Sequence, residues 1–331
     1  MSILDGKNVL ITGATGSFGK RFVRHVLGHH KPARLVVFSR DELKQFEMQQ
    51  EIQSPVLRYF LGDVRDTGRL HRAFDGVQVV IHAAAMKQVP ASEYNPMEAI
   101  KTNIIGAENV INVCIDQGVE RVIALSTDKA ANPVNLYGAT KLCADKLFVA
   151  ANALSGKHRT RFSVVRYGNV VGSRGSVIPF FMQKRASGAI PITDARMTRF
   201  WITLGQGIEF VLDCLERMRG GEIFVPKIPS MKVTEVAEVV APGCRREVIG
   251  IRPGEKLHEI MVTPDDAINT VEFERHYVIQ PAAHWWDQAR YLKDSGARRV
   301  AEDFKYSSDG NPDWLTRAQL AEILKHEKIE L

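Results

Sequence analysis

Tyr137 and Lys141 have the side chains and the spacing for acid–base chemistry. They are four residues apart, so on a helix they share one face. A free tyrosine has a pKa of about 10 and is a poor base at neutral pH. A lysine cation beside it favours the phenolate, which makes Tyr137 a base for a hydroxyl group. Ser126 and Thr127 end a predicted strand just upstream, which makes the pattern more specific.

A glycine-rich loop follows the first predicted strand directly and opens a helix. Glycine has no Cβ, so the backbone can turn tightly and approach a pyrophosphate closely. The helix N-terminus then offers free N–H groups and a partial positive charge to that anion. This context predicts a dinucleotide-binding site. The candidate contacts in the loop are Gly13, Thr15, Gly16, Ser17, Phe18 and Gly19.

The end of the second predicted strand selects the cofactor. An acidic residue there would bind the ribose 2′-hydroxyl of NAD, but this sequence has Ser39 and Arg40, with Lys44 one helical turn later. Arg40 could clamp a 2′-phosphate through paired hydrogen bonds, and Lys44 is either a second ligand or a solvated charge. Asp41 lies next to them, so NAD stays an alternative, but NADP is favoured.

The third and fourth predicted strands add further candidates. Asp63 could accept a hydrogen bond from the adenine amine or could merely cap a turn. His82 is expected to pack under the sheet, and the residues after it to border cofactor and substrate. Further cofactor contacts are expected from Asp63, Val64, Ala83, Ala84, Ala85, Lys87 and Asn103.

These motifs together resemble the extended short-chain dehydrogenase/reductase family. The resemblance rests on Gly13-x-x-Gly16-x-x-Gly19, His82-Ala-Ala-Ala85, Asn103, Thr127 and Tyr137-x-x-x-Lys141, and it extends to about residue 262. It implies that Thr127 hydrogen-bonds the reacting hydroxyl, that Tyr137 is the base and that Lys141 holds the nicotinamide ribose. For Asn103 it implies structural or proton-relay support, with a locally satisfied helix residue as the alternative.

Asp128 and Lys129 narrow the chemistry to elimination of water from a sugar. A 4-epimerase only removes and returns a hydride, so it has no use for this extra pair. In a 4,6-dehydratase, oxidation at C4 acidifies the C5 proton, which a base removes while an acid protonates the departing C6 hydroxyl. We expect Asp128 to protonate O6. Lys129, held neutral by the like charges of Lys141 and the nicotinamide, would remove H5.

The segment Thr127-Asp-Lys-Ala-Ala-Asn-Pro133 resembles the C5-inverting UDP-N-acetylglucosamine 4,6-dehydratases that open the pseudaminic acid pathway. The match continues through residues 166–176, 197–201, 226–231 and 252–258. Long membrane-bound relatives carry methionine in place of Tyr137, so the short soluble form is the better match. The alternatives are a UDP-sugar 4-epimerase or decarboxylase, a non-inverting dehydratase, a non-catalytic NADP sensor or a nucleic-acid-binding module.

The predicted substrate contacts lie mainly in the second half of the chain. Arginine forks suit a diphosphate, and the resemblance implies Arg199 and Arg252 as diphosphate ligands with Asn169 assisting. Each arginine could instead form a surface ion pair. The full set of expected substrate contacts is Lys87, Asn169, Thr193, Arg199, Arg252 and Glu255.

Composition limits the remaining possibilities. The chain has 331 residues and a formal net charge of +6, which suits a soluble protein or one with an anionic ligand such as a nucleotide. The sequence has no separate block of Lys and Arg with interleaved aromatic residues, so it gives little support to nucleic-acid binding. Four scattered cysteines argue against metal binding and disulfides. With neither a signal peptide nor an apolar span expected, we predict a cytoplasmic homo-oligomer without membrane contact.

The elements that must position these residues alternate along the first half. Strands are predicted at 8–12, 34–39, 56–61, 77–82, 121–126 and 161–166, and helices at 17–27, 41–50, 96–117 and 137–154. This alternation predicts an α/β fold, a doubly wound parallel sheet of Rossmann type. Residues 1–167 would bind NADP. Residues 168–331 would form a smaller α/β substrate-binding lobe with small β/α units at 222–240 and 247–261, possible return of one strand to the main sheet, and helices near 288–295 and 316–325.

Overall fold

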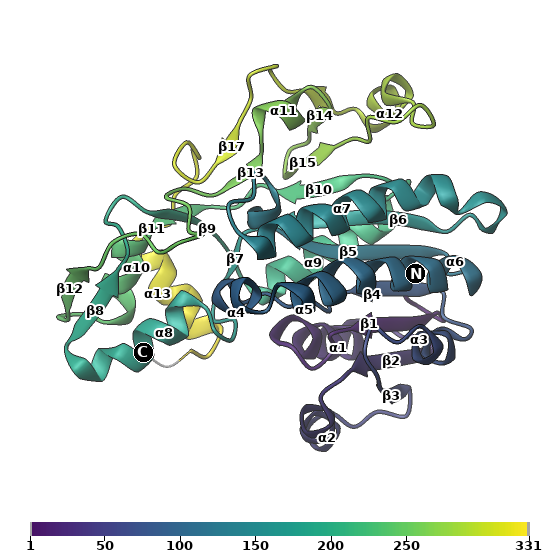
Figure 1. The fold of residues 1–331 in the computed structure, drawn as a ribbon, viewed down its shortest axis with the longest axis horizontal. Coiled ribbons are helices and arrows are strands. Elements are labelled where there is room, and N and C mark those ends of the chain that lie inside the picture. Colours follow the sequence, from purple (N-terminus) through teal and green to yellow (C-terminus); the bar gives the residue numbers. More distant parts are fainter. Residues whose placement is uncertain (1, 330–331) are drawn as a thin grey trace.

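A computed structural model describes residues 2–329 and contains one large sheet with a smaller lobe beside it (Figure 1). The ten strands of the sheet run in the order β16-β14-β15-β10-β6-β5-β4-β1-β2-β3. The first six strands in the chain are β1 (Asn8–Thr12), β2 (Arg34–Ser39), β3 (Leu57–Leu61), β4 (Val79–His82), β5 (Arg121–Thr127) and β6 (Arg161–Tyr167). They all pair in parallel. The predicted doubly wound fold is therefore confirmed.

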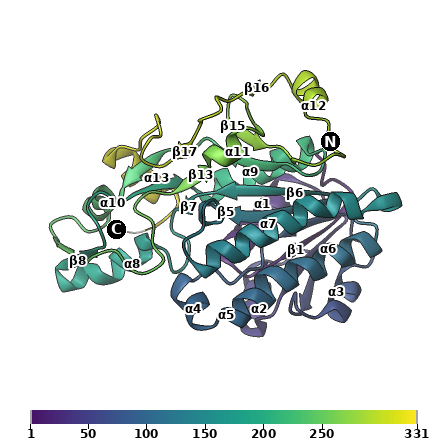
Figure 2. The same cartoon turned by 45° about the horizontal axis from the view of Figure 1, so that its top comes forward.

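Helices cover both faces of this sheet, as its apolar strands require. One face carries α3 (Thr67–Phe74), α4 (Val89–Tyr94), α5 (Pro96–Ile100), α6 (Gly106–Asp116) and α7 (Leu136–Leu154) (Figure 2). On the other face, α1 (Ser17–His29) packs against α9 (Leu204–Arg217). Helix α1 buries Phe22, Val23 and Val26, which repeat at helical spacing. Helix α2 (Glu42–Glu51) follows β2.

The predicted helix over residues 96–117 contains an unexpected wide turn. Between α5 and α6, residues Lys101–Ile105 form a π-helical segment. Such segments within α-helices are frequent at functional sites, and this one carries Asn103. The structure also contains α3, α4, α8 (Val177–Lys184) and α9, which the sequence analysis does not predict.

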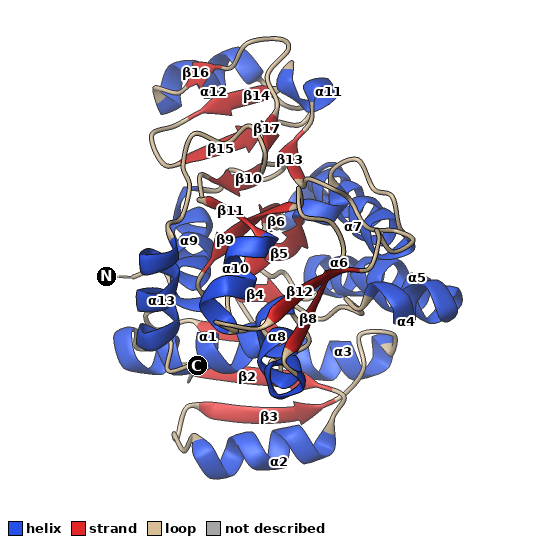
Figure 3. Cartoon of the chain, turned by 90° about the vertical axis from the view of Figure 1, so that its left-hand side faces the viewer, coloured by secondary structure: helices blue, strands red, loops and turns tan. Residues whose placement is uncertain are grey.

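The second half of the chain contributes more to the main sheet than the single strand expected. Strand β10 (Ile223–Pro226) pairs in parallel with β6. Strands β14 (Thr270–Glu272), β15 (His276–Ile279) and β16 (Arg298–Arg299) then extend the sheet through antiparallel pairs. Figure 3 shows the sheet continuing from β3 to β16. Helix α9 lies between β6 and β10 in the chain and provides the crossover that a pair of parallel strands needs. Strand β10 can therefore join the main sheet beside β6.

The lobe is built around its own apolar cluster, which includes Trp201, Met231 and Val236. Its strands are β7 (Asn169–Val170), β8 (Ala189–Ile192), β9 (Thr198–Ile202), β11 (Ser230–Lys232) and β12 (Arg245–Val248). Its helices are α8, α10 (Val233–Val240) and α13 (Arg317–His326), which returns from the far end of the chain (Figure 1).

Four short elements, two strands and two helices, complete the fold. Strand β13 (Ile260–Val262) pairs with β17 (Tyr306–Ser307), and α11 (Pro264–Ala267) and α12 (Gln288–Ser295) lie beyond it. The β/α unit predicted at 247–261 is wrong, because the structure describes that whole stretch and it holds turns and bends between two strands. Its glycines and proline at 250–254 favour turns over a helix.

Residues 2–329 contain neither a membrane-spanning helix nor a cluster of metal-binding side chains. None of the helices described there has both the length and the apolar character needed to cross a bilayer. Within the same residues, no three His, Cys, Asp or Glu side chains are arranged to hold a metal ion.

Candidate active site

A cavity of about 940 Å³ lies between the main sheet and the lobe. It occupies the carboxyl ends of the parallel strands, where doubly wound sheets bind their ligands. The predicted residues that line it are Gly13, Thr15, Gly16, Ser17, Phe18, Gly19, Ser39, Arg40, Lys44, Asp63, Val64, Ala83, Ala84, Ala85, Lys87, Thr127, Lys129, Tyr137, Lys141, Asn169, Thr193, Arg199, Arg252 and Glu255. Asp128 and Asn103 are buried directly beside lining residues.

The glycine loop packs closely against neighbouring backbone, which is possible only because it lacks side chains at these positions. Gly13 has a φ of +66°, and a Cβ on it would lie 2.8 Å from the Ala84 nitrogen. A Cβ on Gly19 would collide with the backbone of Ala14. Helix α1 begins at Ser17, and its N-cap residue Gly16 provides no capping side chain. The first N–H groups of α1 are therefore directed at the cavity, which fits the pyrophosphate of a dinucleotide.

The charged side chains after β2 differ in how far they are already paired with other protein groups. The Asp41 carboxylate caps α2 by accepting from the Lys44 backbone N–H at 3.0 Å, and it also pairs with the Lys44 ammonium. Asp63 accepts from the Arg65 backbone N–H at 3.0 Å, as the turn-capping alternative expects. The Arg40 side chain is 59% exposed, and its Nη1 lies 3.8 Å from Asp63 Oδ2. Arg40 is thus more available to a ligand than Lys44, which is paired with Asp41.

Asn103 is satisfied by protein partners. Its Oδ1 accepts from the Met86 N–H at 2.8 Å, and its Nδ2 donates to the Met86 carbonyl at 2.9 Å and to Thr140 Oγ1 at 3.0 Å. The side chain therefore joins the loop after β4 to helix α7. This arrangement matches the local structural alternative, and direct contact with a cofactor stays a prediction.

The acid–base cluster is centred on a short 3₁₀ helix, Asp128–Ala130, that Thr127 caps. Thr127 Oγ1 donates to Asp128 Oδ1 at 2.9 Å, and the Lys129 ammonium donates to the same oxygen at 2.9 Å. Lys129 Nζ also lies 3.3 Å from Oε1 of Glu259. Asp128 is fully buried, and burial, with a smaller contribution from the Glu259 charge, raises its pKa although Lys129 opposes the rise. A raised pKa suits an acid.

The expectation that Lys129 is held neutral is wrong in this structure. Burial works against the ammonium, but the Asp128 and Glu259 carboxylates outweigh it and hold the pKa of Lys129 above its ordinary value. The physical reason is that Lys129 faces two carboxylates, whereas the prediction considered only like charges. Lys129 is therefore an ammonium between these two carboxylates.

The Tyr137–Lys141 pair shares a buried helix face as predicted, but its charges act differently from expectation. Burial raises the pKa of Tyr137 to about 12, opposed by the Lys129 charge and a hydrogen bond with Thr127. The Lys141 ammonium donates to the Leu125 carbonyl at 2.7 Å, and burial lowers the pKa of Lys141. Among the residues of the site, the cation that favours the Tyr137 phenolate is Lys129.

The two predicted diphosphate ligands differ in availability. The Arg199 guanidinium donates to the backbone carbonyls of Thr198 at 2.7 Å and Lys256 at 2.9 Å, so it holds the neighbouring segment in place. Arg252 is 61% exposed and pairs with Glu255, with its Nε 3.0 Å from Oε1. Arg252 is thus free to turn to a ligand, and the diphosphate role of Arg199 stays a prediction.

Glu259 and Lys256 line the cavity and received no role from the sequence. Lys256 Nζ lies 3.7 Å from Glu259 Oε2 and donates to the Ala131 carbonyl at 2.6 Å. Lys256 lies within segment 252–258, which carries the family resemblance, and Glu259 follows this segment directly; that proximity is the one signal that could have drawn attention to them.

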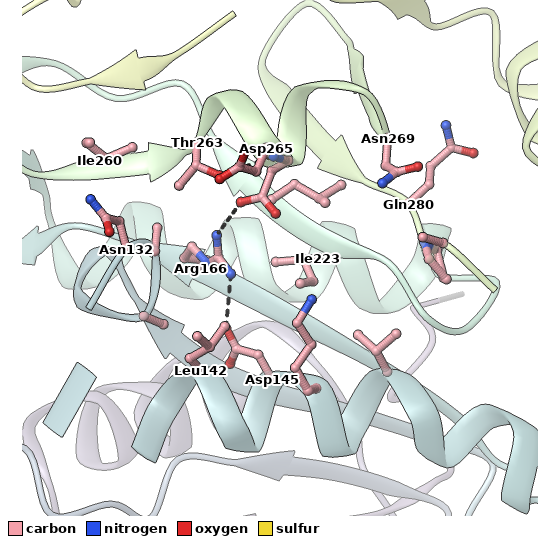
Figure 4. Close-up of a pocket in the computed structure, with 18 of the residues that line it drawn as sticks. Asn132, Leu142, Asp145, Arg166, Ile223, Ile260, Thr263, Asp265, Asn269 and Gln280 are labelled. Atoms are coloured by element: carbon pink, nitrogen blue, oxygen red, sulfur yellow. Dashed lines mark hydrogen bonds and ion pairs between the residues drawn. The ribbon is translucent and has the colours of Figure 1, made fainter. Parts of the chain in front are cut away.

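A second cavity of about 420 Å³ lies behind the acid–base cluster, between α7 and α11 (Figure 4). Arg166 lies inside it with Nη2 3.3 Å from Asp145 Oδ2 and Nη1 3.6 Å from Asp266 Oδ2. Arg166 also donates to the Met261 carbonyl at 3.0 Å, and the Ser126 hydroxyl donates to Asp145 at 2.8 Å. These contacts fix β5, α7 and β13 relative to one another directly behind the site.

The strand order, the glycine cradle and the Tyr137–Lys141 face define a nucleotide-binding protein of the short-chain dehydrogenase/reductase type. A family model described as polysaccharide biosynthesis protein matches residues 9–281. The inverting UDP-N-acetylglucosamine 4,6-dehydratase of Campylobacter jejuni is 57% identical over 331 residues, covering 98% of this chain and 99% of that protein. A UDP-glucose 4-epimerase of Rickettsia canadensis is 38% identical, covering 96% and 95%.

Among solved structures, Pen from Bacillus thuringiensis superposes with a TM-score of 0.90 at 35% identity, covering 99% of this chain and all of that one. The chain therefore belongs to the polysaccharide biosynthesis protein family. The family resemblance inferred from the sequence is confirmed.

Proposed function

We propose that this protein is an inverting UDP-N-acetylglucosamine 4,6-dehydratase. The observation that carries the proposal is the Thr127–Asp128–Lys129 cluster beside Tyr137, because an epimerase needs no second acid and base. The Campylobacter jejuni dehydratase, 57% identical over nearly its whole length, supports the same function. The product would be UDP-2-acetamido-2,6-dideoxy-β-L-arabino-hexos-4-ulose.

The first chemical step concerns the C4 hydroxyl. A nicotinamide dinucleotide held in the glycine cradle would supply the chemistry of accepting a hydride from C4 and returning it at C6. Tyr137 takes the O4 proton, while Thr127 orients the hydroxyl. The Lys129 cation lowers the pKa of Tyr137 against the effect of burial, so it stabilises the phenolate that this step needs.

The elimination step uses the Asp128–Lys129 pair. A proton that passes from the Lys129 ammonium to Asp128 along their 2.9 Å hydrogen bond creates a neutral amine and a carboxylic acid together. The amine then removes H5, and the acid protonates O6 as the C6–O bond breaks and water leaves. This returns the pair to ammonium and carboxylate. After elimination, C5 receives one proton on its other face. In total the sugar loses two protons, from O4 and C5, and gains two, at O6 and C5, so the number of protons balances.

The ligand assignments are proposals of the same kind. Arg40 favours NADP over NAD through the 2′-phosphate, with Lys44 nearby. Arg252 and Glu255, with Lys87, Asn169, Thr193 and Arg199, would bind UDP-N-acetylglucosamine. Residues 1–167 would mainly bind the cofactor and residues 168–331 the nucleotide sugar.

The cellular assignments rest on less specific features. All four cysteines, which lie within residues 2–329, are free thiols, and this supports the reducing cytoplasm as the location. Tyr94 and Met97 are 88% and 57% exposed on neighbouring helices, which supports a homo-oligomer. The sequence resemblance supports a role in pseudaminic acid biosynthesis and flagellin glycosylation.

Mass spectrometry of the nucleotide sugar tests the proposed reaction. Purified protein is incubated with UDP-N-acetylglucosamine and NADP⁺. A product lighter than the substrate by one water supports a dehydratase. A product of unchanged mass with altered retention would mean a 4-epimerase, and the proposal would then be withdrawn.

A further inference from the structure

Glu259 is a buried carboxylate at the edge of the active site that the proposed chemistry does not use. It lies just before β13, is 2% exposed, and lines the cavity. Its backbone N–H donates to Ser308 Oγ at 2.9 Å, and Ser308 Oγ lies 2.7 Å from Thr198 Oγ1. These contacts fix the backbone of Glu259, so the position of its carboxylate is determined by the fold.

The Glu259 carboxylate gathers three cations. Oε1 lies 3.3 Å from Lys129 Nζ and 3.7 Å from Arg199 Nε, and Oε2 lies 3.7 Å from Lys256 Nζ. Lys129 is thereby held between Glu259 and Asp128. A lysine with a single hydrogen-bonded carboxylate could still swing about that contact, whereas two carboxylates on different elements fix its ammonium.

We propose that Glu259 is a positioning residue of the dehydration: it fixes Lys129 against Asp128 and joins this acid–base pair to segment 252–258, which carries the proposed nucleotide-sugar ligands Arg252 and Glu255. The inference rests on the proposed function. The connection to the segment is direct, because the Lys256 ammonium donates at 2.6 Å to the carbonyl of Ala131, the residue that follows the catalytic 3₁₀ helix.

The surrounding charges give the two carboxylates different roles. Glu259 faces Lys129 and Asp128 from the 3₁₀ helix, Arg199 from β9 and Lys256 from its own segment. Burial disfavours the Glu259 anion, but Lys129, Arg199 and Lys256 outweigh this and lower its pKa. For Asp128, burial and the Glu259 charge raise the pKa, although Lys129 and the hydrogen bond from Thr127 oppose the rise. Glu259 therefore stays ionised, and Asp128 is the carboxylate that accepts the proton.

Removal of the Glu259 charge has a defined effect on pH dependence. Its negative charge raises the pKa of both Asp128 and Lys129. Glu259→Gln therefore lowers both pKa values, and both limbs of the kcat profile move to lower pH, by on the order of one pH unit. We also expect kcat to fall at least about tenfold, with a smaller change in KM.

The experiment compares wild type, Glu259→Gln and Glu259→Asp by the pH dependence of UDP-N-acetylglucosamine dehydration. Glu222→Gln is the matched control, because Glu222 is equally buried but bonds Ser163 and the Arg219 backbone N–H. Thermal unfolding and NADP⁺ binding verify that each variant is folded. We expect the acid shift in Glu259→Gln, partial recovery of kcat in Glu259→Asp, and an unshifted profile in Glu222→Gln.

The possible failures are distinguishable. If wild type releases no water from the substrate, the proposed function is wrong. If wild type is a dehydratase and folded Glu259→Gln keeps its pH profile and kcat, the positioning role is wrong. If Glu259→Gln does not fold, Glu259→Asp decides, since a shortened carboxylate must still lower kcat while keeping the limbs within the wild-type range; wild-type kcat in that variant would overturn the inference.

Discussion

Gly13→Ala should weaken cofactor binding without preventing folding. The residue has a φ of +66°, a conformation that costs an alanine about 1–2 kcal/mol. The added Cβ would lie 2.8 Å from the Ala84 nitrogen and 2.9 Å from the Ala83 carbonyl carbon. Neither backbone group can retreat freely, because Thr12 Oγ1 accepts from both of their N–H groups at 3.1 and 3.2 Å. The loop itself must therefore move.

The magnitude follows from these two terms. Strain and displacement together should reduce the free energy of NADP⁺ binding by roughly 2–3 kcal/mol, which is about 30- to 150-fold in Kd. Isothermal titration calorimetry measures Kd, and thermal unfolding measures the stability of the free protein. Gly28→Ala is the control: Gly28 lies in α1, and the described residues leave open space around its Cβ, so it should retain wild-type Kd. Equal NADP⁺ affinity in wild type and Gly13→Ala would refute the cradle argument.

Three further predictions address the base, the cofactor and the core. Tyr137→Phe should lower kcat about 10²- to 10⁴-fold with little change in NADP⁺ affinity, because it removes the O4 base and keeps the ring; stopped-flow absorbance would show an unimpaired first oxidation if Tyr137 is not that base. Arg40→Ala should weaken NADP⁺ binding at least about tenfold and leave NAD⁺ binding unchanged; parallel losses for both cofactors would contradict a 2′-phosphate contact. His82 is buried, and burial, helped by Lys141, lowers its pKa from 6.5 to about 3. Its contribution to stability is therefore complete above about pH 6.5 and is lost as pH falls toward 3, on the order of a few kcal/mol in all. In urea titrations, His82→Gln should flatten this slope, and an unchanged slope would show that other groups cause it.

The sequence predicted the first half of the fold closely because its signals are local. Strands β1 and β2 have the predicted bounds, since each contains an uninterrupted apolar run that ends at a polar residue. The destination of β10, β14 and β15 could not be predicted in the same way. These strands are short, and their place in the main sheet depends on pairing with distant segments.

In the candidate site too, local features could be predicted from the sequence and long-range contacts could not. The spacing of Tyr137 and Lys141 is a property of one helix, so their shared face followed directly from the sequence. The charge of Lys129 did not follow, because Glu259 reaches it from a segment far along the chain. For the charge of Lys129, the prediction counted only the like charges of Lys141 and the cofactor. Tertiary contacts of this kind decide the pKa of a buried group, and sequence spacing does not contain them.

The most direct test of the central claim is proton NMR of the purified protein with UDP-N-acetylglucosamine and NADP⁺ in D₂O. We predict a new 6-deoxy methyl signal, deuterium at C5, and coupling constants of the L-arabino 4-keto sugar. The same methyl group in the D-xylo configuration would contradict inversion and the role assigned to Lys129. A 4-epimer, or unchanged substrate, would contradict dehydration itself.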